Sequence, residues 1–294
     1  MANLRDVRLR MRAIEQTLQV TKAMNLISTS KLRKGRRILE DTEPYFTRIG
    51  LSMFDILSAG ARVHSNFLSR PDTGDRYRSA IVAITTDKGL AGGYNANIYR
   101  TVLNLCATVR NPILVLVGSI GYHYFIHTSQ VILENFSFRS RIPTVENARE
   151  IADYLIAQYI GGMFNEVHIV YTHMYSALKL LPTERQLLPL KIEKLQEQIS
   201  ATGGKKREKL QFEFLPSAEE VFDALVPMYI KGEIYGALIE AYTAEQSARM
   251  AAMDEASKNA EEMLGNLTVY YNRVRQANIT QEMTEIVGGA AALT

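Results

Sequence analysis

The stretch most suggestive of chemistry is Thr86–Asn95, TDKGLAGGYN, which is rich in glycine. It follows residues 79–86, whose β-branched apolar run predicts a buried strand, and it precedes a predicted helix over 95–109. A loop at such a junction can hold a phosphate on its backbone N–H groups. Its spacing matches neither G-x-G-x-x-G nor G-x-x-x-x-G-K-[ST]. We therefore expect a tight turn whose glycines permit unusual dihedrals, with a nucleotide-binding α/β enzyme as the alternative.

The histidines offer two pairs that could serve a metal. His168 and His173 lie five apart in a predicted strand over 166–174, so they should face opposite sides of a sheet. His123 and His127 are four apart in a short predicted helix and could share a metal, but no third ligand is evident. We expect solvated or packed histidines and predict no metal site.

The single cysteine, Cys106, cannot close an intrachain disulfide. It sits in an apolar helical stretch, where a thiol is expected to be buried rather than nucleophilic. The sequence has no G-x-S-x-G elbow and no H-E-x-x-H pattern. We therefore predict no catalytic residue and no cofactor.

Charge is distributed unevenly along the chain. Residues 1–40 hold ten Lys/Arg and three Asp/Glu, a net +7, and residues 217–294 hold five Lys/Arg and twelve Asp/Glu, a net −7. Such ends should attract one another. The densest basic cluster comprises Lys31, Arg33, Lys34, Arg36 and Arg37. It leaves open a basic helical nucleic-acid-binding protein, although no aromatic residues are interleaved for base stacking.

The N-terminal segment reads as one long helix. Its apolar residues recur at alternating spacings of three and four, the heptad pattern of a coiled coil, and the frame runs through Leu4, Val7, Met11, Ile14, Leu18, Leu32, Leu39, Phe46, Ile49, Met53 and Ile56. In the middle the frame lands on Thr21, Asn25, Ser28 and Gly35. Pro44 predicts a kink or short break. A helix over 3–58 would be about 85 Å long.

The C-terminal segment reads in the same way. Ser217 and Glu220 have the spacing of a capping box, and Pro227 predicts a kink. One heptad frame then takes in Val221, Leu225, Met228, Tyr235, Ile239, Tyr242, Met253, Ala256, Ala260, Met263, Leu267, Tyr270, Val274 and Ala277. A helix over 218–287 would be about 105 Å long.

Neither helix could hold its apolar seam in water alone, so we expect an intramolecular antiparallel coiled coil. If residue 57 lies near residue 221, counting back along both helices places Leu4 near Val274. About twenty residues at the C-terminal end would then extend as a single helix. The arginine-rich N-terminus resembles a mitochondrial presequence in composition, but its apolar period continues beyond any plausible cleavage point.

The middle of the chain alternates strand-like and helix-like stretches, which predicts a mostly parallel sheet with flanking helices. Strands are expected at 79–86, 112–118, 130–136, 166–174 and 185–192, and helices at 95–109, 122–127 and 144–160. Residues 193–210 predict an exposed excursion. We therefore divide the chain into a coiled-coil helix over 1–60, an α/β foot domain over 75–212 and a second coiled-coil helix over 215–294.

Both termini carry specific strings. The chain opens MANLRDVR and continues with VTKAMNLISTSKLRK over 20–34, and it closes with NRVRQANITQEMTEIV over 272–287 followed by GGAAAL. These strings, in order and at these ends, closely resemble the gamma subunit of rotary F-type ATP synthases, and the DKGLAGGYN segment is similar to that family's motif. The resemblance covers the whole chain. Its start at the second residue, without a transit peptide, favours a bacterial type.

The resemblance implies an α/β fold in which long antiparallel N- and C-terminal helices accompany a central Rossmann-like domain. It implies a non-catalytic rotor shaft that couples proton flow to ATP synthesis or hydrolysis. Its implied partners are the alpha and beta subunits of the catalytic hexamer, the epsilon subunit and the membrane c-ring. It implies no cofactor and no nucleic acid, with peripheral attachment at the cytoplasmic face of the cell membrane through the complex.

Contact residues follow from the same resemblance. It implies contacts with the alpha and beta subunits at Lys22, Met24, Asn25, Arg275, Gln276, Thr280, Gln281, Glu282 and Glu285. The polar break at Thr21, Asn25 and Ser28 weakens the seam where the TKAM string lies, so we expect those turns to serve outward contacts.

Overall fold

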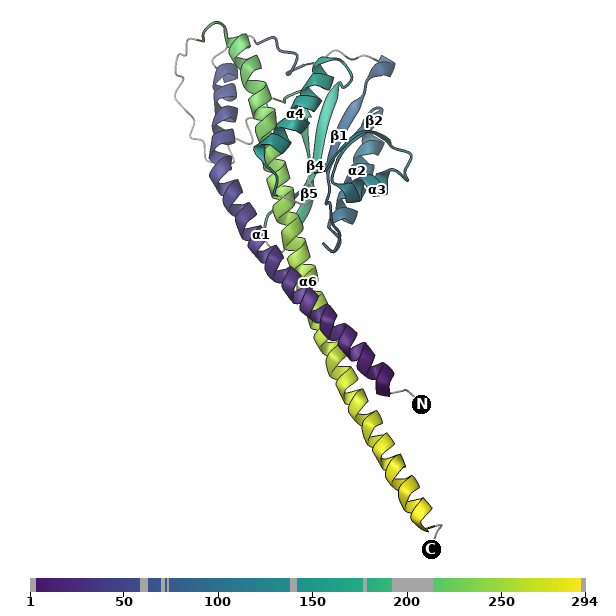
Figure 1. The fold of residues 1–294 in the computed structure, drawn as a ribbon. Coiled ribbons are helices and arrows are strands. Elements are labelled where there is room, and N and C mark those ends of the chain that lie inside the picture. Colours follow the sequence, from purple (N-terminus) through teal and green to yellow (C-terminus); the bar gives the residue numbers. More distant parts are fainter. Residues whose placement is uncertain are drawn as a thin grey trace. The chain divides into compact units, whose positions relative to one another are not determined.

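The computed structural model describes residues 4–58, 63–69, 72, 74–137, 142–176, 179–191 and 214–291. Its elements, in chain order, are α1 (Leu4–Ser58), η1 (Gly74–Arg76), β1 (Ser79–Ile84), α2 (Tyr94–Thr108), β2 (Pro112–Val117), α3 (Ser119–Phe125), β3 (Val131–Phe136), α4 (Val145–Ile160), β4 (Glu166–Met174), β5 (Leu180–Leu188) and α6 (Ala218–Ala291) (Figure 1). The predicted elements are confirmed to within a few residues. The excursion predicted at 193–210 lies outside the described residues.

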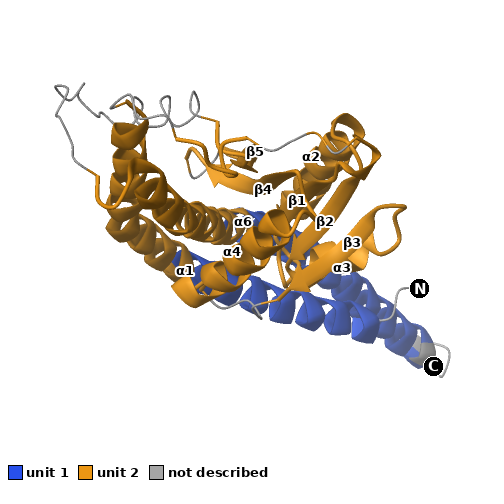
Figure 2. Ribbon diagram, turned by 90° about the horizontal axis from the view of Figure 1, so that it is seen from above, with its two compact units in different colours: residues 1–29, 249–294 blue, residues 30–248 orange. Residues whose placement is uncertain are grey.

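The chain forms two compact units, and both contain parts of the long helices. Unit 1 comprises residues 1–29 and 249–294, and unit 2 comprises residues 30–248 (Figure 2). Each unit therefore pairs a piece of α1 with a piece of α6, and unit 2 adds the whole α/β region. The division into segments 1–60, 75–212 and 215–294 groups residues by their position in the sequence, and it stays a prediction.

Unit 2 is built on a five-stranded sheet with the order β3-β2-β1-β4-β5. The pairs β1–β2, β1–β4 and β2–β3 are parallel, whereas β5 runs antiparallel to β4. The mostly parallel sheet predicted from the alternation of strands and helices is confirmed. The first strand is buried at every position, as expected where helices cover both faces of a sheet.

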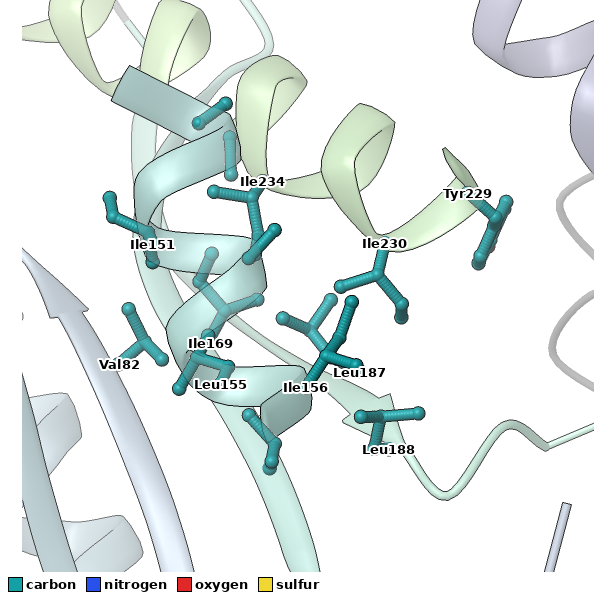
Figure 3. Close-up of a cluster of buried hydrophobic side chains, with 14 of the residues drawn as sticks. Val82, Ile151, Leu155, Ile156, Ile169, Leu187, Leu188, Tyr229, Ile230 and Ile234 are labelled. Carbon is teal, nitrogen blue, oxygen red and sulfur yellow. The ribbon is translucent and has the colours of Figure 1, made fainter. Parts of the chain in front are cut away.

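Two buried clusters lie on opposite faces of this sheet. On one face, helices α4 and α6 and the end of α1 cover the sheet. Val82 and Ile169 of the sheet pack there with Ile151 and Leu155 of α4 and Ile230 of α6 (Figure 3). On the other face α2 and α3 pack against alternate residues of the same strands. Because successive strand residues point to opposite faces, one apolar run supplies both layers.

The heptad frame predicted for α1 is confirmed throughout. Every position of the frame from Leu4 to Ile56 is buried or half-buried, including the polar ones. The helix also continues through Pro44, so the predicted break is wrong. Pro44 and Glu40 are both exposed, and water can therefore bond the Glu40 carbonyl that loses its helical partner.

The frame predicted for α6 is wrong at three positions in unit 1, while Ala256 is half-buried as predicted. Met253, Ala260, Leu267 and Val274 lie in the seam as predicted. At the positions between them the seam uses the residue that follows the predicted one. Met263, Tyr270 and Ala277 are exposed, whereas the seam side is taken by Ser257, Leu264, Tyr271 and Asn278, which are buried or half-buried. Neighbouring residues such as Met263 and Leu264 are both apolar, so the sequence pattern accepts either choice.

Two glycines let the long helices approach closely in unit 2. A Cβ built on Gly35 would lie 2.6 Å from the Thr243 hydroxyl, and one built on Gly232 would lie 2.1 Å from the Phe46 ring. A poor helix former stands at both sites because a side chain of the other helix occupies the space of its Cβ.

We predict that Gly232→Ala lowers the free energy of unfolding by about 1–3 kcal/mol, since the added methyl group must displace the Phe46 ring. Gly236→Ala is the matched control on the same helix, because its Cβ meets nothing within 4 Å. It should be neutral or stabilising by up to about 1 kcal/mol. Urea unfolding of the full chain measures both, and equal effects of the two substitutions would refute the close contact at Gly232.

Candidate interaction surfaces on the long helices

The polar middle of the seam is a set of hydrogen bonds between α1 and α6 within unit 1. The Ser257 hydroxyl donates to the Thr21 hydroxyl at 2.8 Å, and the Asn25 amide donates to the Met250 carbonyl at 3.1 Å. Thr21 and Ser257 are buried, so their hydroxyls are bonded as burial requires. The seam stays closed here although its apolar residues are interrupted.

These bonds fix the register of the antiparallel pair. Thr21 faces Ser257, and near the N-terminal start of α1 the Arg8 guanidinium donates to the Tyr271 hydroxyl at 2.5 Å. Counting from the Thr21–Ser257 contact places Leu4 opposite Val274. The predicted register is therefore confirmed.

The polar residues of the break face the seam, and the outward contacts expected of these turns stay a prediction. Thr21 and Ser28 are buried and Asn25 is half-buried, and both Thr21 and Asn25 bond α6. The heptad frame had already placed these three residues on the seam. A contact of Asn25 with a partner subunit stays a prediction.

The outward face of the same turns is apolar. Val20, Leu26 and Ile27 expose 57%, 71% and 54% of their surface, and Met24 is half-buried beside them. Lys22 is also exposed, and its ammonium lies 2.6 Å from a Glu261 carboxylate oxygen. An exposed pair of this kind contributes little to stability, so Lys22 can exchange partners at low cost.

The C-terminal end of α6 exposes a second apolar stripe. Ile279, Met283 and Ile286 follow one another at spacings of four and three, and each is about half exposed or more. Such a stripe on a helix indicates a surface that another protein covers. Sequence reasoning did not single out these three residues, although their position outside the seam frame was a usable signal.

The contact residues implied for α6 lie around this stripe. Arg275, Gln276, Thr280, Gln281, Glu282 and Glu285 are all exposed. The Gln281 amide donates to the Glu285 carboxylate at 3.0 Å along the helix. The structure therefore gathers the six residues on one helical segment together with Ile279, Met283 and Ile286, and it places Lys22, Met24 and Asn25 on α1.

The basic cluster on α1 lies in unit 2 and is largely exposed. Arg33, Lys34, Arg36 and Arg37 are exposed and Lys31 is half-buried. The Arg37 guanidinium lies 3.9 Å from the Asp41 carboxylate one turn later, and an Arg36 nitrogen lies 3.9 Å from the Met174 sulfur.

The glycine-rich loop that begins at Thr86 is bonded mainly to its own domain. The Asp87 carboxylate accepts from the Ser119 backbone N–H at 2.8 Å and from the Ser137 hydroxyl at 2.9 Å. The Asn95 side chain bonds both the backbone N–H and the hydroxyl of Thr86. These bonds tie together the carboxyl ends of β1, β2 and β3. Gly92 has a φ of 56°, which confirms the tight turn expected for this loop.

His168 and His173 both lie beside carboxylates of the same fold. His168 lies 3.1 Å from Glu184 and 3.5 Å from Glu166, while His173 contacts Glu240. The two histidines thus bond different carboxylates, which agrees with the expectation that they face opposite sides of the sheet. Among the described residues no group of three His, Cys, Asp or Glu could hold a metal ion.

Cys106 is buried, and burial raises the pKa of its thiol to about 11, so the thiol stays protonated at neutral pH. In the part of the chain that the structure describes, no helix carries an apolar stretch long enough to cross a bilayer.

Comparisons with known proteins agree over the full length. A family model described as ATP synthase matches residues 3–293. The chain is 44% identical over 292 residues to the ATP synthase gamma chain of Ruminiclostridium cellulolyticum, covering 99% of both proteins. It is 36% identical over 301 residues to a gamma chain of Acetobacterium woodii named as sodium ion specific, again covering 99% of both.

Solved structures show the same fold at lower identity. A chain of the Euglena gracilis mitochondrial ATP synthase, in a structure of OSCP, F1 and c-ring, aligns with a TM-score of 0.65 at 16% identity, covering 99% of this chain and 94% of that chain. A chain of the central stalk and c-ring structure from Tetrahymena thermophila aligns with a TM-score of 0.60 at 23% identity, covering 81% and 99%.

We predict that cysteines replacing Thr21 and Ser257, in a Cys106→Ala background, form a disulfide under mild oxidation. The two hydroxyl oxygens lie 2.8 Å apart, which places the two side chains within reach of a bridge. Ala23→Cys with Ser257→Cys is the control, because Ala23 is exposed on α1. Non-reducing gel mobility of the full chain measures both, and equal bridging in the two variants would contradict the register.

Proposed function

The chain belongs to the ATP synthase gamma-chain family, and on this premise we propose that the exposed side chains of α1 and α6 in unit 1 contact the alpha and beta subunits as the shaft turns. As a gamma chain it is the central rotor shaft subunit of the ATP synthase. It is not itself catalytic, and it couples ion flow through the membrane ring to ATP synthesis and hydrolysis in the alpha/beta hexamer.

The observation that carries the proposal is the exposed stripe of Ile279, Met283 and Ile286 on α6. By the register of the pair, these residues lie beyond the position that Leu4 reaches. A helix that exposes large apolar side chains on such an end gains stability only when another protein surrounds it. A hexamer enclosing this end would provide that cover.

The polar residues around the stripe suit a contact that must form and break. Arg275, Gln276, Glu282 and Glu285 are exposed, and exposed charge or amide pairs contribute about 1 kcal/mol or less each. A shaft that slides past three similar faces would be held back by deeply buried contacts. Weak polar contacts allow the shaft to leave one orientation and take up the next. Lys22 on α1 is also an exposed charge that can make such a weak contact.

We assign the remaining partners to the α/β region of unit 2. A relative of known structure comes from a central stalk with its c-ring, which supports a c-ring as a partner of this chain. We propose the epsilon subunit as a second partner of the same region. The complex is membrane-associated, and we propose that this chain lies at the cytoplasmic face of the cell membrane and is held there by its partners.

We predict that Arg275→Ala with Gln276→Ala lowers the ATPase rate of the assembled complex, or the yield of assembly, by about three- to tenfold. The loss corresponds to two polar contacts of about 0.3–0.7 kcal/mol each. The isolated chain should keep its unfolding midpoint, because both side chains are exposed. Reconstitution with alpha and beta subunits measures rate and yield together.

The matched control removes an amide and a guanidinium from another helix. Asn97→Ala with Arg100→Ala changes two exposed residues of α2 and should leave both ATPase rate and assembly unchanged. Unchanged rate and assembly in the Arg275 and Gln276 variant would refute those two contacts.

A further inference from the structure

The sheet of unit 2 meets α6 through a ladder of charged side chains. His173 on β4 contacts Glu240, and an Arg185 guanidinium nitrogen on β5 lies 2.5 Å from a Glu233 carboxylate oxygen. Figure 1 shows β4 and β5 beside α6. Glu233 and Glu240 are seven residues apart, so they lie on one face of the helix about 10 Å from each other. Each carboxylate therefore has one basic partner on the sheet.

The ladder is largely removed from water. The side chains of Glu233 and Glu240 are 16% and 18% exposed, and those of Arg185 and His173 are 34% and 33% exposed. Charges in such a setting interact more strongly than at an open surface, and an unmatched carboxylate is costly. The ladder balances two carboxylates against two cations only when the His173 imidazole is protonated.

We propose that His173 and Glu240 form a protonation-dependent clasp that tightens the attachment of the β4–β5 edge to α6 at lower pH and loosens it as pH rises. The Arg185–Glu233 ion pair beside it stays charged over the same pH range. This clasp is a property of the chain's own fold, so it stands independently of the subunit contacts proposed above.

The arginine and the tyrosines packed around His173 keep one charge state near neutral pH. The hydrogen bond to Glu240 raises the pKa of His173 above 6.5, against opposing effects of burial and of Arg185. Burial lowers the pKa of Arg185, but Glu233, Tyr171 and Glu240 together raise it above the ordinary value, so Arg185 keeps its charge. Burial raises the pKa of Tyr171 on β4 and of Tyr229 on α6, so both stay neutral.

The remaining neighbours do not replace Glu240 as a partner. The Tyr175 ring meets the His173 ring edge-on with 4.4 Å between centroids, and the Lys179 ammonium lies 5.5 Å from the centre of the Tyr175 ring. On α1, Arg36 approaches the strand at Met174, next to His173. Both added charges are positive, so neither can pair with a protonated His173 in place of Glu240.

The direction of the pH effect follows from the raised pKa. The folded chain holds the proton on His173 more tightly than the unfolded chain does, so the clasp contributes fully below about pH 6.5. Its contribution is lost as the pH rises through the pKa of the folded state. Acidification therefore strengthens the attachment of the sheet to α6.

The test compares the full chain with His173→Gln by amide hydrogen exchange at pH 6 and pH 9. Comparing the two proteins at one pH cancels the intrinsic pH dependence of exchange. We expect the β4–β5 edge and residues 233–243 to be about three- to tenfold better protected in the original chain at pH 6, with no difference at pH 9. The same ratio at both pH values would overturn the proposal.

A second measurement isolates the partner. In the full chain and in Glu240→Gln, the imidazole resonances of the five histidines are followed by NMR as a function of pH. The midpoint assigned to His173 should lie above 6.5 and fall when Glu240 is replaced. An unchanged midpoint would overturn the clasp. For the hydrogen-exchange test the matched control is His123→Gln, which replaces an exposed histidine of α3. Its amide protection should equal that of the original chain at both pH values.

Discussion

The structure depends on the mutual burial of two apolar seams that lie at opposite ends of the sequence. Neither α1 nor α6 could keep its seam in water alone, and each covers the other in both units. The hydrogen bond from Ser257 to Thr21 and the one from Asn25 to Met250 set the antiparallel register within this burial. Small residues at Gly35 and Gly232 allow the backbones to approach in unit 2.

The α/β region uses α6 as part of its own core. From Tyr229 to Ala248 the helix is buried or half-buried at every position, because α1 covers one side and the sheet covers another. The ladder of His173, Arg185, Glu233 and Glu240 adds polar bonds between sheet and helix. A sheet joined to the helix by packing and by ion pairs can transmit force to it, which suits the rotor shaft of an ATP synthase.

The same helices also carry exposed apolar surfaces outside the seam. Where the seam is closed, Thr21 and Ser257 bond each other and stay buried. Outside the seam, Val20 and Ile27 on α1 and Met283 on α6 remain exposed, with polar residues around them. Apolar area that the chain leaves uncovered is the physical signature of a partner, while weak polar contacts around it allow that partner to be exchanged.

The sequence by itself determined the two long helices, their antiparallel register and the mostly parallel sheet, because periodic apolar residues leave few ways to bury them. It could not choose between Met263 and Leu264 for the seam of α6, since both are apolar. Nor could it show which groups of α6 the seam residues Thr21 and Asn25 bond, because polarity does not reveal whether a polar group has a partner. Only the tertiary structure decided these points, as it alone brings Ser257 and Met250 opposite α1 and so shows which polar groups are bonded within the chain.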